Sequence, residues 1–213
     1  MTEYKFMIVF ATLGFDEKFI IRDIFSRGIK QDTKLVIFTS SEDQRVDKAY
    51  SSIVTTFRSL PLNIEKYKIN IENPFYAISS IRKIILEKIR GHSEIVFNLS
   101  GGQRILLAYI LSVITSEKIN CEILMISEDS SIHVSLPSKI FFPLQLDSIS
   151  IEIMRTLKEK GPLKPGEIVK TLNRGRTTIW RKINRLMEEN LVEFDSRIKR
   201  YKITEIGSAF TYF

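Results

Sequence analysis

Apolar runs and helical patterns alternate over residues 1–136. Runs rich in Ile, Val, Leu and Phe at 5–11, 34–39, 94–99 and 121–126 are typical of buried parallel strands. Residues 63–71 alternate apolar and polar side chains, which predicts a half-buried edge strand. Residues 131–136 are expected to pair with 121–126 as an antiparallel hairpin. Helical spacing of apolar side chains predicts four helices, at 16–27, 42–60, 75–90 and 103–117.

This order predicts an α/β Rossmann-like domain over residues 1–136, with a parallel sheet covered by helices on both faces. Ligands of such sheets bind at the carboxyl ends of the strands, so the loops at 12–16, 39–43 and 98–103 are candidate ligand loops. The helix at 103–117 is apolar on nearly all sides, so a second surface besides the sheet must cover it. A partner subunit is favoured over another helix of the same domain, which predicts a homodimer.

A different pattern follows a connector at 137–146. Residues 147–213 form three helical segments (150–160, 164–172 and 177–190) and two alternating segments (191–196 and 199–204) that predict a hairpin. This is the order of a winged helix-turn-helix domain, and 188–205 resembles the corresponding part of MarR- and ArsR-like regulators. The third helix has one apolar face, and Trp180 at the edge of that face is expected to pack in the core or against a second copy.

The opposite face of the third helix carries donors suited to the major groove of DNA. These residues are Thr178, Arg181, Lys182 and Arg185. Contacts to phosphate are expected around the start of the helix and at the hairpin tip, from Arg174, Arg176, Thr177, Arg197, Lys199 and Arg200. The alternative is a solvated basic face on a small helical domain, but the order of elements and two separate basic clusters favour double-stranded DNA.

The charge of the chain supports the same division. The net charge is +7, and residues 147–213, with 14 Lys or Arg against 9 Asp or Glu, account for +5 of it. A hydrophobic content of 44% excludes a disordered chain, while one cysteine and two histidines exclude a disulfide framework and argue against a four-ligand zinc site. The sequence lacks a long apolar run and a signal-peptide pattern, so we expect a cytoplasmic protein with no membrane association, no metal and no cofactor.

Two glycine-containing loops follow predicted strands. The first loop is Thr12-Leu13-Gly14-Phe15, and the second loop is Asn98-Leu99-Ser100-Gly101-Gly102-Gln103-Arg104. Free backbone N–H groups at a helix start, with Ser100, Gln103 and Arg104 as side-chain donors, suit phosphate groups. Neither loop contains a dinucleotide fingerprint or a P-loop, which disfavours NAD, FAD and P-loop ATP binding. Each loop taken singly is equally consistent with a structural turn.

The Thr-x-Gly-Phe loop, the Asn-x-Ser-Gly-Gly-x-Arg loop and the winged helix together resemble CRISPR-associated Rossmann fold (CARF) transcriptional regulators. The nearest subgroup is the archaeal type I-A one. The resemblance implies a homodimer that binds a cyclic oligoadenylate, typically the tetra-adenylate, across its two-fold axis, and that binds operator DNA. It implies these ligand-binding residues: Thr12, Leu13, Gly14, Phe15, Asn98, Ser100, Gly101, Gly102, Gln103 and Arg104. Asn98 stands where many members carry Asp.

Some CARF domains cleave the cyclic ligand that they bind, so a ring nuclease is the alternative function. Ser100 and Arg104 are suited to positioning and charge stabilisation, but neither loop contains a histidine to act as a base. We therefore assign no catalytic residue and expect a regulator that is not an enzyme. The fused RNase domain of other CARF proteins is nearly excluded, because residues 147–213 contain no histidine.

Overall fold

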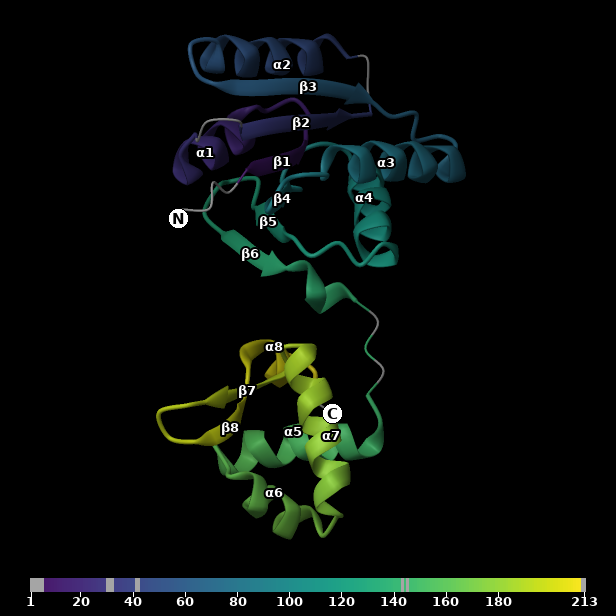
Figure 1. Ribbon diagram of the computed structural model, residues 1–213. Coiled ribbons are helices and arrows are strands. Elements are labelled where there is room, and N and C mark those ends of the chain that lie inside the picture. Colours follow the sequence, from purple (N-terminus) through teal and green to yellow (C-terminus); the bar gives the residue numbers. More distant parts are fainter. Residues whose placement is uncertain (1–5, 30–32, 41–42, 143, 145, 212–213) are drawn as a thin grey trace. The chain divides into compact units, whose positions relative to one another are not determined.

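A computed structural model describes residues 6–29, 33–40, 43–142, 144 and 146–211, and every structural statement below refers to these residues. The chain divides into two compact units, Met1–Phe142 and Pro143–Phe213, each of which is described by itself (Figure 1). The predicted first residues of the strand at 5–11 and of the helix at 42–60 lie outside the described residues, as does part of the loop at 39–43.

The first unit is built on a six-stranded sheet in the order β3-β2-β1-β4-β5-β6. Its strands are β1 (Met7–Thr12), β2 (Thr33–Thr39), β3 (Leu62–Lys68), β4 (Glu94–Asn98), β5 (Glu122–Ile126) and β6 (His133–Pro137). The first five are parallel, and β6 pairs antiparallel with β5. These findings confirm the predicted mostly parallel sheet, its edge strand and its hairpin.

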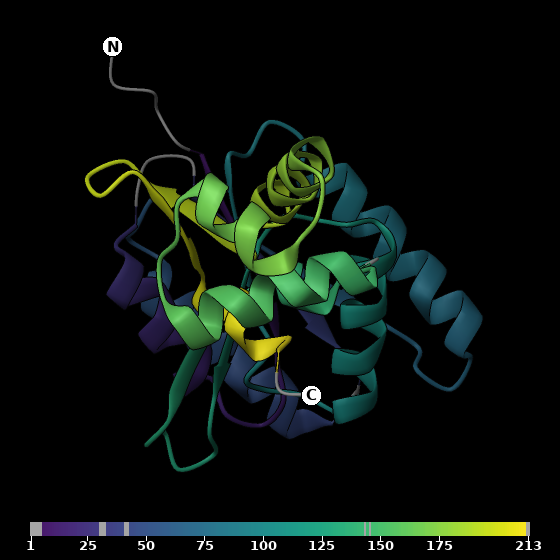
Figure 2. The same cartoon turned by 90° about the horizontal axis from the view of Figure 1, so that it is seen from below.

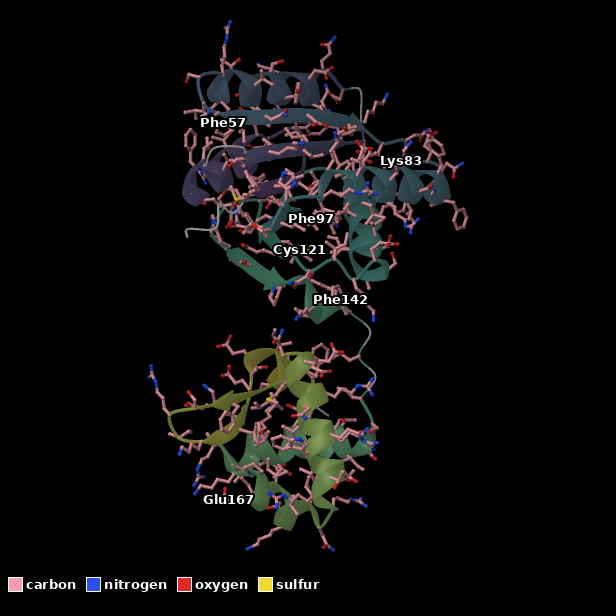
Figure 3. All side chains as sticks on the ribbon, in the orientation of Figure 1. Phe57, Lys83, Phe97, Cys121, Phe142 and Glu167 are labelled. Carbon is pink, nitrogen blue, oxygen red and sulfur yellow. The ribbon has the colours of Figure 1, made fainter. Side chains whose placement is uncertain are left out.

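Helices cover both faces of this sheet. Side chains alternate along β1, so Ile8 and Phe10 join the core under α3 (Pro74–Lys88) and α4 (Arg104–Ser116). Met7, Val9 and Ala11 join the opposite core under α1 (Lys18–Arg27) and α2 (Gln44–Phe57). Phe97 of the first core and Phe57 of the second are labelled in Figure 3. The Rossmann-like fold class is therefore confirmed.

The central strands β1 and β4 lie side by side, but the chain leaves them toward opposite faces of the sheet. After β1 it enters α1 on one face, and after β4 it enters α4 on the other. Such a reversal of strand order separates the two connecting loops and is the usual ligand site of doubly wound sheets. The fold thus places the first and second loops at its switch point.

The first unit extends beyond its predicted end at residue 136. Ser138 begins a short 3₁₀ helix, η1 (Ser138–Phe141); its hydroxyl donates to the Ile119 carbonyl at 2.7 Å and accepts from the Cys121 backbone N–H at 3.0 Å. The predicted linker at 137–146 is therefore too long at its start. Burial raises the pKa of the Cys121 thiol to about 11, so this cysteine stays protonated in the core at neutral pH.

The second unit is a three-helix bundle with a hairpin that projects from it (Figure 2). Its elements are α5 (Ser148–Lys160), α6 (Pro165–Leu172), α7 (Arg176–Glu188), β7 (Val192–Asp195), β8 (Arg200–Ile203) and α8 (Glu205–Ala209). Ile153, Ile168 and Ile183, one from each of the first three helices, are fully buried. The winged helix is confirmed, whereas α8 falls in what the sequence pattern left as a tail. Its Gly207 packs so closely on Leu191 that a Cβ there would overlap the Leu191 carbonyl oxygen.

Candidate functional site

The two glycine-containing loops contact each other through their backbones. The Thr12 hydroxyl donates to the Gly101 carbonyl at 2.6 Å, and the Leu13 backbone N–H bonds to Phe38 of β2 at 3.0 Å. A Cβ on Gly101 would lie 2.7 Å from the Thr12 carbonyl oxygen, and one on Gly14 would lie 2.9 Å from the Gly102 nitrogen. Glycine is therefore required at both positions by this close approach, and the two loops form one structural feature.

Asn98 positions the second loop from inside the protein. Its side chain is buried; the amide nitrogen donates to the Phe19 carbonyl and to the Asp23 carboxylate, each at 3.1 Å. Its amide oxygen accepts from the backbone N–H of Ser100 at 3.2 Å and from the Ser100 hydroxyl at 2.6 Å. Asn98 was predicted among the ligand-binding residues; in the structure both ends of its amide are used within the protein, so its side chain supports the second loop.

Other members of the predicted ligand set are also oriented inward. Ser100 donates its hydroxyl proton to Asn98 and accepts from the Ile126 backbone N–H at 3.0 Å, so its oxygen supports the turn. Thr12 and Leu13 are each 1% exposed, so both residues support the loop from within and neither offers a surface to a ligand. The structure brings the two predicted loops together, but the sequence pattern did not separate the residues that build them from those at their surface.

A buried ion-pair network supports Asn98. Arg27 donates to the Asp23 carboxylate at 2.6 Å and to the two oxygens of Glu122 at 2.9 and 2.7 Å. Burial raises the pKa of Asp23, whereas the hydrogen bonds from Arg27 lower the pKa of Glu122. Ser135 of β6 also donates to Glu122 at 2.7 Å. The network joins α1, β5 and β6 to the base of the second loop.

The exposed end of the site lies at the start of α4. Gln103 is the N-cap residue and makes no side-chain capping bond, so the first N–H groups of this 13-residue helix are open to a ligand. The side chains of Gln103 and Arg104 are exposed, and no ion pair of Arg104 is found in the described part of the chain. Uncapped N–H groups with a guanidinium beside them form an anion site of the kind that binds phosphate.

Phe15 adds an aromatic surface to this edge of the sheet. Its ring is 56% exposed, and the Arg45 guanidinium lies 3.8 Å from the ring centroid. Arg45 also pairs with Asp43, the N-cap residue of α2, at 2.6 Å. Sequence reasoning missed Arg45. Its position in the first turn of α2, directly after the loop that follows β2, was the available signal for a residue at this edge of the sheet. The stacked Phe15–Arg45 pair is a flat surface with one cationic face, which suits a base or another planar group.

The winged helix places a second set of predicted residues on the outer face of α7. Thr177 and Arg181 are exposed one turn apart, and Asn184 follows on the same face at the next turn. They line a shallow depression of about 480 Å³ together with Arg185. Asn184 was missed by sequence reasoning, although its spacing from Thr177 and Arg181 marks it; an amide here is suited to pairing with adenine. Thr178 is half-buried beside this face.

The residues predicted to contact phosphate flank this face. Arg174 and Arg176 are exposed at the start of α7, whose N-cap Gly175 provides no side-chain cap. Arg197 and Lys199 are exposed at the hairpin turn, where the Asp195 carboxylate accepts from the Arg197 backbone N–H at 2.9 Å. Arg200, predicted at the tip, instead lies in β8, and its guanidinium donates to the Pro162 carbonyl at 2.9 Å. The tip prediction is wrong for Arg200.

Two side chains of α7 are oriented differently from their predictions. Lys182 was expected on the outward face, but its ammonium pairs with Asp147 and its side chain is only 15% exposed. The predicted outward orientation of Lys182 is therefore wrong. Trp180 was expected in the core or against a second copy; half of it is exposed, which contradicts the core position, while packing against a second copy stays a prediction. Both residues lie at the border between the apolar and polar faces of the helix, where tertiary contacts determine the orientation of a side chain.

The Asp147–Lys182 pair makes the second unit sensitive to acid. The hydrogen bond from Lys182, followed by that from the Ser150 backbone N–H, lowers the pKa of Asp147 from 3.8 to about 2. Because the pKa of Asp147 is lower in the folded than in the unfolded state, the pair stabilises the unit at pH values above the unfolded-state pKa. This stabilisation is lost as the pH falls toward 2. We expect Asp147→Asn to flatten the acid limb of the stability curve, measured by urea unfolding followed through Trp180 emission. The exposed carboxylate of Glu159 on α5 is the control: if Glu159→Gln changes the curve as much as Asp147→Asn, the assignment is contradicted.

The remaining chemically active side chains form no further centre. Among the described residues no group of three or more His, Cys, Asp and Glu is arranged to hold a metal ion. The His92 ring lies 3.2 Å from the Arg90 carbonyl, and the ring of His133, the first residue of β6, lies 3.2 Å from the Ser130 carbonyl; both histidines are outside the two loops. No helix in the described ranges has the length and apolar character needed to cross a bilayer.

Comparison with solved structures finds chains of low similarity to this one. Can2 from Sulfobacillus thermosulfidooxidans, in complex with cyclic tetra-adenylate, is 11% identical with a TM-score of 0.45, covering 95% of this chain and 62% of that one. Csm6 from Enterococcus italicus, bound to cyclic hexa-2'-fluoro-hexa-dAMP, is 10% identical with a TM-score of 0.47, covering 87% and 55%. The chain thus spans less than two thirds of either protein.

The Zbeta domain of human DAI is similar to a short part of the chain. The identity is 26% and the TM-score 0.26, with 29% of this chain and 90% of that one covered. No curated protein matches the sequence.

Family models match both units of the chain. The model of winged helix-turn-helix DNA-binding domains matches residues 146–193, which span α5 to β7. The model of the Csa3 CRISPR-associated Rossmann-like domain matches residues 7–137, from the start of β1 to the end of β6 and more than half of the chain. The protein therefore belongs to the Csa3 family of CRISPR-associated Rossmann-like domains and carries a winged helix in the same chain.

Proposed function

We propose that this protein is a homodimeric transcriptional regulator of CRISPR-Cas loci that binds operator DNA in the cytoplasm and senses a cyclic oligoadenylate, with cyclic tetra-adenylate the first candidate. The observation that carries the proposal is the uncapped start of α4 at the switch point, with Gln103 and Arg104 exposed beside it. A winged helix with outward arginines in the same chain supports the DNA-binding half. The predicted relation to the type I-A subgroup and the predicted archaeal source remain predictions.

The ligand site is proposed to use the surface of the two loops. Backbone N–H groups at Gly102, Gln103 and Arg104 bind phosphate, Arg104 supplies the charge, and Phe15 with Arg45 supplies a surface for a base. Thr12, Asn98 and Ser100 hold the loops in place. Part of the predicted set thereby touches the ligand, and part of it supports the loops.

Arg104→Ala tests this site most simply. We expect the variant to lose about tenfold to a hundredfold in affinity for cyclic tetra-adenylate, because a charge-assisted contact to phosphate contributes about 1.5–3 kcal/mol. Titration calorimetry measures the change. Arg90 is an exposed arginine just beyond the C-terminal end of α3. Arg90→Ala is the control and is expected to bind the ligand as the wild type does. Equal affinities of the two variants would contradict the assignment of Arg104.

A second copy is proposed to cover the exposed start of α3 and α4. Phe75, Tyr76 and Ile105 are exposed by 86%, 66% and 51% at the beginning of these two packed helices. Monomers rarely leave several large apolar side chains exposed close together. A two-fold axis here brings two copies of the second loop together, which suits a ligand that is itself symmetric. Sedimentation of the full chain tests the dimer.

DNA binding is tested at the outward face of α7. We expect Arg181→Ala to weaken binding by ~1–3 kcal/mol and to relax the sequence preference at one position, because an arginine that reads a guanine edge contributes that much. Lys182→Ala is the matched control, since the Lys182 ammonium is engaged by Asp147. The test is competition binding with duplexes selected from a random library. If Lys182→Ala weakens binding more than Arg181→Ala, the proposed orientation of the helix on DNA is contradicted.

The alternative function is a ring nuclease that cleaves the cyclic ligand. The observation that favours it is the proximity of Arg104 to the uncapped helix start, which would stabilise charge on a reacting phosphate. Against it, the Ser100 hydroxyl is hydrogen-bonded within the protein and both histidines lie outside the loops. Incubation of the full chain with cyclic tetra-adenylate, followed by separation of linear products, distinguishes the two functions. A regulator returns the ligand intact.

A further inference from the structure

Trp180 is the one tryptophan of the sequence and lies half-exposed on the recognition helix α7. It lines two hollows: the depression on the outer face of the helix, and a groove of about 370 Å³ between α6 and α7 that also involves Pro165 and Val169. An indole that is half in water gives up a large favourable burial, so an exposed tryptophan usually marks a contact surface. The exposure of Trp180 therefore indicates a surface that contacts a partner.

The hairpin holds Trp180 in a defined orientation through Tyr201, which is itself buried at 4% exposure. The rings of Trp180 and Tyr201 meet edge to face, with centroids 6.4 Å apart and planes at 76°. Tyr201 in turn contacts Phe194 at 5.0 Å, and Phe194 is 47% exposed. We call Trp180, Tyr201 and Phe194 the aromatic band. It runs from the recognition helix α7 onto both strands of the hairpin.

Basic side chains flank both ends of the aromatic band. Arg176 and Arg181 are exposed on α7, within one turn of Trp180. Arg197 and Lys199 are exposed at the turn of the hairpin, beyond Phe194. A partner that contacts both basic clusters must therefore be anionic at two separate places and apolar between them. Duplex DNA has this character, because rows of phosphates alternate with deoxyribose rings and with the methyl groups of thymine.

We propose that the aromatic band is part of the DNA interface, with Trp180 packed on deoxyribose rings and base methyl groups of the strand that spans the two basic clusters. This inference rests on the proposed DNA-binding function and extends it to an apolar contact that adds affinity without neutralising phosphate. Contacts to phosphate release counterions and make binding depend on salt, whereas apolar burial does not. The salt dependence of binding therefore separates the two kinds of contact.

The test compares three variants of the full chain on one duplex, selected by the wild-type protein from a random library. We expect Trp180→Ala to bind about tenfold more weakly at every salt concentration, with the slope of log K against log salt unchanged. Arg197→Ala, by contrast, is expected to reduce that slope by about 1. Phe194→Ala is a second change to the band that leaves Trp180 in place. Phe194→Ala is expected to weaken DNA binding while the slope of log K against log salt stays unchanged. This variant keeps the test valid even if Trp180→Ala does not fold.

Trp180 also reports directly on its own surroundings, because no other tryptophan contributes to the emission. We expect its fluorescence to change on saturation with the selected duplex. Unchanged emission at saturation, or wild-type affinity of both band variants, would overturn the inference while leaving DNA binding intact. A changed sedimentation coefficient of Trp180→Ala without a change in DNA affinity would also overturn it, by showing a protein interface. Failure of the wild-type chain to select any duplex would instead overturn the proposed function.

Discussion

Gly101→Ala is expected to abolish ligand binding while the protein remains folded. The added Cβ would lie 2.7 Å from the Thr12 carbonyl oxygen, a contact with backbone that no side-chain rotation relieves. The two loops must therefore separate, which displaces the start of α4 from the position proposed to bind phosphate. Displacements of about 1 Å at a binding site cost on the order of a hundredfold in function, and overpacking of this kind costs about 1–3 kcal/mol in stability.

Calorimetry with cyclic tetra-adenylate measures the loss, and circular dichroism checks the fold. Gly166→Ala is the matched control, because its Cβ would meet no atom within 4 Å and an alanine in α6 is expected to stabilise the helix slightly. Gly101→Ala with wild-type ligand affinity would show that contact between the loops is irrelevant to the site. Loss of binding in Gly166→Ala as well would place the ligand elsewhere.

Arg27→Ala is expected to produce the largest loss of stability in the first unit. The change leaves Asp23, whose side chain is 2% exposed, without its cation and removes both hydrogen bonds to Glu122. Breaking a buried pair by removing one partner typically costs 3–5 kcal/mol, because a charge stays buried without compensation. Asp23 also accepts from Asn98, so the second loop is expected to loosen and ligand affinity to fall with stability.

Urea unfolding followed by circular dichroism measures this effect. Arg22→Ala changes an exposed arginine of the same helix and is expected to have little effect. The double variant Arg27→Ala/Asp23→Asn is expected to recover part of the stability, because the orphaned charge is removed while a hydrogen-bonding group for Asn98 remains. Equal unfolding of the Arg27 and Arg22 variants would show that the network contributes nothing.

The fold was predictable because its signals are local and repeated. The runs at 34–39 and 94–99 are apolar without interruption, as strands covered on both faces must be, and β2 and β4 are found there. The end of the first unit was not predictable, because Ser138 is held by hydrogen bonds to Ile119 and Cys121, which no local pattern encodes. Likewise, α8 is only five residues long and carries too little periodicity to be recognised.

The contact between the two candidate loops was predictable from the sequence, but the orientations of their side chains were not. Glycines after β1 and β4 mark close backbone approach, and the structure brings these loops together at the switch point. Whether Asn98 points inward or outward depends on Asp23, which is distant in sequence and lies on another element. Arg45 was missed for the same reason, since only the fold places it on Phe15. Residues that build a site and residues that use it look alike in sequence.

Ligand bound at the first unit is proposed to change DNA binding by the second. The direct measurement is the affinity of the full chain for its selected duplex, without cyclic tetra-adenylate and at saturation. Coupling between sites is typically ~5–150-fold, and by linkage DNA must change ligand affinity by the same factor. We predict a change within this range in wild-type protein and none in Gly101→Ala. Identical DNA affinities with and without ligand, in a chain shown by calorimetry to bind it, would contradict the account.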